Sequence, residues 1–146
     1  MTTPPPPFAM QRVVFVALLL GQSLFAVVVG VLLQTRGGRG LAEPPLPLLD
    51  TVVLVTGISL TSASLVLRRI LSRVATSLDG DARAHARFRA TLIPLAMLEG
   101  GSLFGITAWL LNGNAVPPLA VAIAMLAIAV VMVPFTDPDR GEPDRR

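Results

Sequence analysis

The chain has 146 residues, of which 53% are hydrophobic and only 14% charged, and its apolar residues fall into long runs. All 12 basic residues are arginine, cysteine and tyrosine are absent, and histidine occurs once. This composition excludes disulfide frameworks, thiol nucleophiles, lysine Schiff bases and thiolate metal sites. The net charge of +3 comes from arginines that flank apolar segments, which favours a membrane protein over a nucleic-acid binder.

Four apolar runs approach the roughly 20 residues that a helix needs to cross about 30 Å of hydrocarbon. They predict transmembrane helices at about residues 13–33, 50–71, 90–111 and 115–135. Backbone groups inside a bilayer must satisfy their own hydrogen bonds, and runs of this length do so as helices. The predicted fold class is therefore all-α, an integral membrane protein with four transmembrane helices.

The segments between and around these runs are polar or rich in breaking residues. We expect a disordered head over residues 1–12, which contains four consecutive prolines, and a disordered tail over residues 136–146. The polar segment 72–89 is predicted to be a cytoplasmic loop whose flanks extend the neighbouring helices, with a break at Asp79-Gly80-Asp81. Asn112-Gly113-Asn114 predicts a tight turn before the last helix.

The distribution of arginine predicts the orientation. With four retained spans, both ends of the chain and the segment 72–89 share one side of the membrane, and the segment between the first two spans lies on the other. The first side carries ten arginines and the second only Arg36 and Arg39. The positive-inside rule then places both termini in the cytoplasm. The lack of lysine beside abundant Ala, Arg, Gly and Pro is typical of a GC-rich bacterial genome, so we expect the bacterial inner membrane.

Glu99 is the residue most able to carry chemistry. It is the tenth residue of the 22-residue run 90–111, close to the predicted middle of the bilayer. A charged carboxylate there costs several kcal/mol, so we expect the group to be protonated at rest and to exchange its proton. The alternative is that Glu99 donates a hydrogen bond to Gln22 or to a serine of a neighbouring helix and only stabilises packing. No cofactor and no metal site are predicted.

Small and polar residues predict which helix faces pack closely. Gly101 and Gly105 form a GxxxG pattern, which permits close approach of two backbones. A short repeat relates residues 21–25 to residues 100–104, by duplication or by chance, and places a polar cluster at mid-membrane in both copies. Asp50 is predicted to be the N-cap of the second helix. The predicted packing and supporting polar residues are Gln22, Ser23, Gly57, Ser62, Gly101, Ser102 and Gly105.

The stretch from Arg89 to Glu99, followed by Gly100-Gly101-Ser102-Leu103-Phe104-Gly105, resembles the second helix of the rotary ATPase proteolipids, the c-type subunits. In that family an arginine at the cytoplasmic end precedes a mid-membrane carboxyl, and small residues with an aromatic–glycine pair follow it. The run 50–71, rich in small residues, is similar to the family's first helix. By this resemblance Glu99 is the ion-carrying carboxyl.

Two functions follow from these patterns. The first is a proteolipid-like, proton- or ion-handling subunit that uses Glu99, and the second is a non-catalytic scaffold or accessory subunit of a larger membrane complex. An enzyme is not predicted, because no second catalytic group accompanies the carboxyl. The expected partners are the lipid bilayer, further copies or other membrane subunits, and anionic lipid headgroups at the arginine-rich side, with no nucleic acid.

Overall fold

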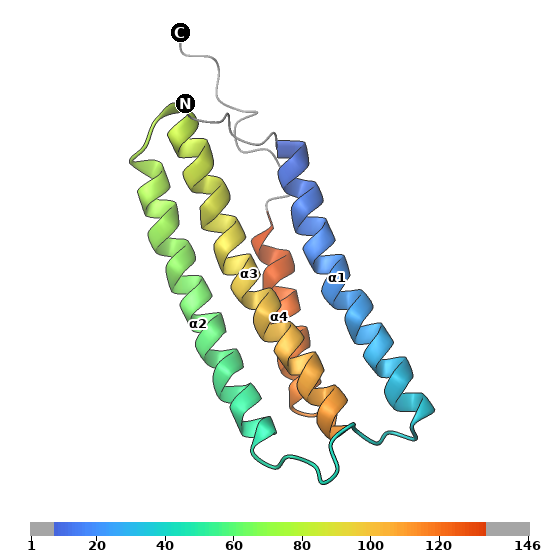
Figure 1. Ribbon diagram of the computed structural model, residues 1–146. Coiled ribbons are helices and arrows are strands. Elements are labelled where there is room, and N and C mark those ends of the chain that lie inside the picture. The colour runs from blue at the N-terminus through green and yellow to red at the C-terminus, as the bar shows by residue number, and fades with distance from the viewer. Residues whose placement is uncertain (1–7, 134–146) are drawn as a thin grey trace.

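The computed structural model describes residues 8–133 and consists of four helices (Figure 1). They are α1 (Phe8–Thr35), α2 (Leu49–Thr76), α3 (Gly80–Asn112) and α4 (Pro118–Met132). No strand occurs within the described residues. The predicted all-α class is confirmed, whereas the predictions for residues 1–7 and 134–146 lie outside the described part of the chain.

Three of the helices are long and apolar enough to cross a membrane, namely α1 from Arg12 onward, α2 and α3. The fourth is apolar but has 15 residues, which at a rise of 1.5 Å per residue is about 22 Å. It is therefore shorter than the predicted span 115–135. Consecutive prolines at Pro117 and Pro118 set its start, and Val133 leaves the helix with an extended backbone (ψ 123°). Residue 134 is proline, which disfavours helical geometry in the residue before it.

The helices also begin and end elsewhere than hydropathy predicts. Residues 8–12, expected in a disordered head, form the first turn of α1. The segment 72–89 is helical on both flanks, as expected, and its break at residues 77–79 lies slightly earlier than the predicted Asp79-Gly80-Asp81. Arg83 stabilises this turn by donating hydrogen bonds to the carbonyl of Leu78 (2.6 Å) and the carboxylate of Asp79 (3.0 Å). Polar residues are compatible with a helix in water, so the loss of apolar character marks the end of the apolar run and not the end of the helix.

The third helix is the centre of the bundle (Figure 1). It contacts each of the other three, while α1 and α2 lie on opposite sides of it and do not touch each other. α4 packs into the angle between α2 and α3 and has only slight contact with α1. α1 and α3 run in one direction and α2 and α4 in the other (Figure 1). α1 starts near the end of the bundle that holds the α2–α3 turn, and α4 runs toward that end but stops short of it.

The buried apolar side chains form two clusters at different depths along the bundle. The larger cluster lies toward the end with the α2–α3 turn and consists of Phe15, Leu95, Leu98, Met125, Ala129, Met132 and Val133. The smaller cluster lies toward the opposite end and consists of Val29, Leu33, Ile106 and Ala122. Between them α1 contributes Gln22 and α3 contributes Ser102, both buried. The core therefore contains a polar layer near mid-length.

The segment that joins α1 to α2 closes the far end of the bundle. The backbone amides of Leu41 and Ala42 donate to the carbonyls of Leu110 and Leu111, which the end of α3 would otherwise leave unpaired. Asn112 also bonds both the backbone NH and the carbonyl of residue 46, each at 3.0 Å. The segment between α1 and α2 is thus held against the end of α3 by four hydrogen bonds. The prediction of a turn after Asn112 is confirmed, since Gly113 ends α3 with a left-handed backbone.

Candidate functional site

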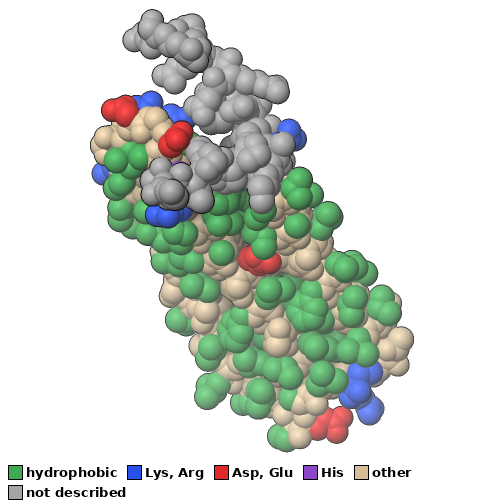
Figure 2. All heavy atoms as spheres, turned by 45° about the horizontal axis from the view of Figure 1, so that its top comes forward, with side chains coloured by type: hydrophobic (Ala, Val, Ile, Leu, Met, Phe, Trp, Pro, Cys, Tyr) green, Lys and Arg blue, Asp and Glu red, His purple; other side chains and the backbone are tan. Residues whose placement is uncertain are grey.

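Glu99 lies in the middle of α3, at the border between the packed and the exposed faces of that helix. Its neighbour Leu98 is fully buried, its neighbour Gly100 is exposed, and Glu99 itself is half-buried. The next turn on the same side carries Ser102, which is 1% exposed. Figure 2 shows an acidic side chain at the surface near mid-length, among apolar side chains and far from the charged ends of the bundle. The sequence and the fold thus both put this carboxyl at mid-length, far from the charged ends of the bundle.

The carboxyl of Glu99 makes no hydrogen bond or ion pair with any residue from 8 to 133. The bond to Gln22 or to a serine, expected under the packing interpretation, is not formed. No arginine of the described chain reaches it. A charge in this position would be costly without a partner, so the neutral carboxylic acid is the form that suits an apolar surface.

Gln22 is the second unusual polar group of the bundle. It lies on α1, is 1% exposed, and neither its side-chain oxygen nor its nitrogen has a hydrogen-bond partner within the described residues. Burying an amide without a partner costs about 1–3 kcal/mol in proteins. The polar layer of the core is therefore incompletely satisfied on its α1 side.

Two contacts align α1 with α3 and show where Gln22 lies along the bundle. The ring centroids of Phe15 and Phe88 are 6.1 Å apart, and a Cβ on Gly30 would lie 3.4 Å from the indole of Trp109. Gln22 is about halfway between Phe15 and Gly30, so it is level with the turn at the middle of α3 that carries the carboxyl. The two polar groups share a depth but are not bonded to each other.

The serines of the short repeat occupy different environments. Ser102 is buried and its hydroxyl donates to the backbone carbonyl of Ala122 on α4, at 3.3 Å. Ser23 is exposed and its hydroxyl donates within its own helix to the carbonyl of Leu19, at 2.9 Å. The two serines therefore lie in different surroundings, and only the serine of α3 bonds a neighbouring helix.

The glycines that predict close packing lie at contacts with α4. A Cβ on Gly57 would collide with Val121, and a Cβ on Gly101 would collide with the tip of Met125. At Gly105 a Cβ would be 2.9 Å from the backbone carbonyl oxygen of Pro118. The GxxxG pattern of α3 therefore receives α4 of the same chain, and it is not exposed to a second protein.

Ser62 is separate from this layer, since it is exposed on α2 and borders an apolar groove between α2 and α3. No group of three or more His, Cys, Asp or Glu residues is positioned to hold a metal ion within residues 8–133. Of the predicted site residues, the fold thus brings Gln22, Glu99, Gly101 and Ser102 to one depth, while Ser23 and Ser62 point away.

Two polar arrangements were not predicted from the sequence. Asp50 is not the N-cap of α2, since it lies within the first turn, and its carboxylate accepts hydrogen bonds from Asn112 and Asn114, each at 3.3 Å. Arg68 donates from its guanidinium to the carbonyl of Met132 at the end of α4, at 3.4 Å. These partners are more than 60 residues apart, so no local pattern could have indicated them.

No known protein family, curated protein or solved structure matches this chain.

Proposed function

We propose that this chain is an integral membrane protein of the bacterial inner membrane, with both termini in the cytoplasm. Three helices with the length and composition of membrane spans support the proposal, and so does the excess of arginine near one end of the bundle. In this proposal α4 is the fourth crossing. Its end is stabilised by the Arg68 guanidinium, a cation at the helix terminus that favours positive charge.

Within the membrane, Glu99 acts as a site that takes up and releases a proton or a small cation. The observation that carries this proposal is a half-buried carboxyl at mid-length, on an apolar surface, with no partner in the described chain. An intramembrane acid with a structural role alone is expected to be buried and hydrogen-bonded to a neighbouring helix. A carboxyl at the border of the bundle is instead accessible to a second subunit or to a water path.

The proposed cycle needs only two states of the carboxyl. The neutral acid faces lipid, and the proton leaves when a cationic group or a water path of an adjacent subunit meets the site, because that environment stabilises the carboxylate. Reprotonation from the other side restores the neutral acid. Such a cycle requires assembly with further copies or other membrane subunits, as the resemblance to proteolipid c-type subunits implies.

Labelling with dicyclohexylcarbodiimide in native membranes tests the proposal, since the reagent modifies protonated carboxyls in apolar surroundings. We expect modification of Glu99, mapped by mass spectrometry, that declines as the pH rises and is absent in Glu99→Gln. Asp50, an acid at the far end of the bundle, is the internal control and should remain unmodified. Absence of labelling at Glu99 over the whole pH range would contradict a protonated, accessible carboxyl.

Proton flux in vesicles then separates ion handling from the scaffold alternative. We expect Glu99→Gln to abolish the flux supported by the native assembly and Glu99→Asp to retain part of it, because only aspartate keeps a titratable group. Full activity of Glu99→Gln would favour a scaffold or accessory subunit. A scaffold would have to contact its partners through the outer faces of α1 and α2, since the glycine pattern is occupied by α4.

A further inference from the structure

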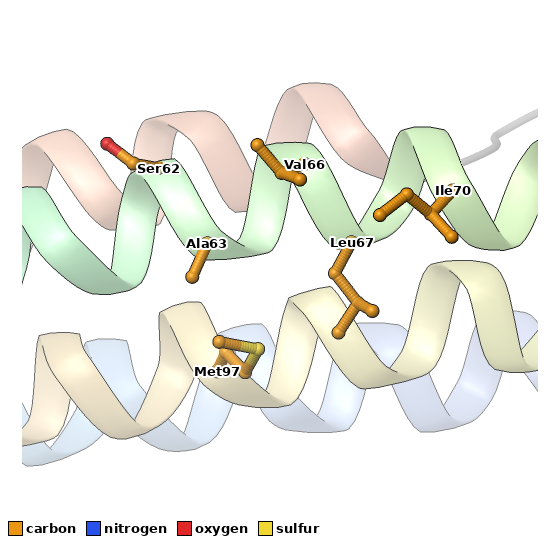
Figure 3. A pocket seen from close by; sticks show the side chains of 6 residues that line it. All are labelled: Ser62, Ala63, Val66, Leu67, Ile70 and Met97. Atoms are coloured by element: carbon orange, nitrogen blue, oxygen red, sulfur yellow. The ribbon is translucent and has the colours of Figure 1, made fainter.

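An apolar groove opens on the outer surface of the bundle between α2 and α3, with a volume of about 440 Å³ (Figure 3). Figure 3 shows Met97 of α3 across from Ala63 and Leu67 of α2, with Ile70 at the end nearer the α2–α3 turn. The lining residues are Ser62, Ala63, Val66, Leu67, Ile70 and Met97.

The shape and lining of the groove suit a hydrocarbon chain. It follows α2 from Ser62 to Ile70, a rise of about 12 Å at 1.5 Å per residue, which is the length of a large part of one acyl chain. Apart from the Ser62 hydroxyl, its side chains are aliphatic or a thioether. The small side chain of Ala63 forms the hollow, because larger residues stand on either side of it along the helix. Any lipid that lies against this face would place a chain here.

Two arginines of α2 stand at the mouth of the groove. Arg69 is one turn beyond Val66, and Arg73 is one turn beyond Ile70, so both lie on the face that lines the groove. Side chains on a helix tilt toward its N-terminus, which directs both stems back toward the groove. Both residues are exposed, and neither guanidinium forms a hydrogen bond or ion pair with another described residue.

A third arginine approaches from α3. Arg89, Ile93 and Met97 follow each other at four-residue spacing, and Arg89 and Ile93 are exposed. α2 and α3 are antiparallel. Gly101 of α3 lies next to Leu60 of α2, and one turn earlier on α3 Met97 lines the groove opposite residues that follow Leu60 on α2. Continuing this register by three turns brings Arg89 level with the arginines of α2. Three unpaired positive charges therefore surround one end of an apolar groove.

We propose that this groove binds one acyl chain of an anionic phospholipid of the bilayer, whose phosphate is held by Arg69, Arg73 and Arg89. The inference rests on the membrane location in the proposed function and adds a specific lipid site to it. Charge complementarity selects the anionic lipid, because a zwitterionic headgroup offers the arginines no net negative charge. Other arginines are engaged within the chain, such as Arg68 with Met132 and Arg83 with Asp79.

Native mass spectrometry of the purified full chain tests the selectivity. The probes are dioleoyl phosphatidylglycerol and dioleoyl phosphatidylcholine, which have the same chains and differ in headgroup charge. We expect one phosphatidylglycerol to be retained with a preference of about tenfold, since each arginine near an anionic headgroup contributes appreciably. Arg69→Gln/Arg73→Gln should remove most of this preference, and Arg89→Gln a smaller part. The matched control Arg36→Gln/Arg39→Gln, at the other end of the bundle, should leave it unchanged.

A second set of variants tests the groove itself. Ala63→Phe fills the hollow and should reduce retention of phosphatidylglycerol at least fivefold while the arginines remain, whereas Ala17→Phe, an equivalent change at an exposed site of α1, should not. Circular dichroism of each variant checks that the helices are intact. Equal retention of the two lipids, or loss of preference only with the Arg36/Arg39 control, would overturn the proposal.

The membrane location is measured separately by alkaline carbonate extraction. A chain that is extracted would refute both this inference and the proposed function. A chain that stays in the membrane and shows no lipid preference would refute the lipid site alone.

Discussion

The two sides of α3 are packed in different ways. On the side of α2 and α4, glycines bring the backbones together, and Gly105 lies close enough to Pro118 that no Cβ fits. On the side of α1, large side chains such as Phe15 and Trp109 separate the helices, and Gln22 is buried without a partner. The contrast indicates that α2, α3 and α4 pack more closely with one another than α1 packs against α3, and that the α1–α3 contact contains the buried amide without a partner.

The physical reason lies in the solvent. In the bilayer location that we propose, the hydrophobic effect does not drive helices together, so association depends on close van der Waals packing and on interhelical hydrogen bonds. The α3–α4 contact has both, through its glycines and the bond from Ser102 to Ala122. The α1–α3 contact has close van der Waals packing only in part, and the Gln22 amide makes no interhelical hydrogen bond within the described chain.

The largest expected effect is on the tight side. Gly105→Ala would place a Cβ 2.9 Å from the carbonyl oxygen of Pro118 and 3.3 Å from the Cβ of Ala122. Because a backbone atom cannot move aside cheaply, we expect the free energy of unfolding to fall by about 1–3 kcal/mol. Thermal or denaturant unfolding in detergent, followed by circular dichroism, measures it.

The matched control is Gly100→Ala on the same helix, where an added Cβ meets nothing within 4 Å. This change should leave stability unchanged or raise it by up to about 1 kcal/mol, since alanine favours a helix over glycine. Equal losses for the two variants would mean that the α3–α4 contact is not as close as described.

An effect of comparable size and opposite sign is expected on the loose side. Gln22→Leu replaces an unpaired buried amide with an apolar side chain of similar size, and should raise the free energy of unfolding by about 1–3 kcal/mol. Ser23→Ala, at an exposed position with only an intrahelical bond, serves as the control and should change little. A loss of stability in Gln22→Leu would show that the amide has a partner in the assembled protein.

The smallest effect concerns the end of α4. Arg68→Gln removes a cation from the helix C-terminus and a 3.4 Å bond to Met132, and should lower the free energy of unfolding by about 0.3–1 kcal/mol. Arg69→Gln removes the same charge one residue further on but breaks no bond within the described chain. In an uncharged detergent this change should therefore leave the free energy of unfolding unaltered. Equal effects of the two changes would assign the result to net charge and not to the cap.

Much of the fold could be predicted because apolar runs report directly on helices in a membrane. The three long helices contain the spans predicted from hydropathy, and Gly57, Gly101 and Gly105 were singled out by size alone. The helix ends were less predictable, because hydropathy marks the limit of the bilayer and the helices continue past it in the segment 72–89.

The candidate site was predictable in its residues and not in its contacts. Glu99 stands out in any reading of the sequence, since a lone acid in an apolar run is conspicuous. Whether it meets Gln22, however, depends on how α1 is rotated about its own axis. Successive side chains of a helix differ by about 100° in direction, so a small rotation decides which of them faces α3. The same applies to the repeat, where Ser23 and Ser102 match in sequence and point to opposite environments.

The sequence by itself determined the all-α class, the number of helices and the position of one carboxyl at mid-length, because long apolar runs between breaking residues are a linear pattern that indicates helices. Only the tertiary structure decided that α4 occupies the glycines of α3, that Gln22 lacks a partner, and that Asp50 and Arg68 bond residues more than 60 positions away. Those contacts depend on the rotation and depth of each helix relative to its neighbours, which no local pattern encodes.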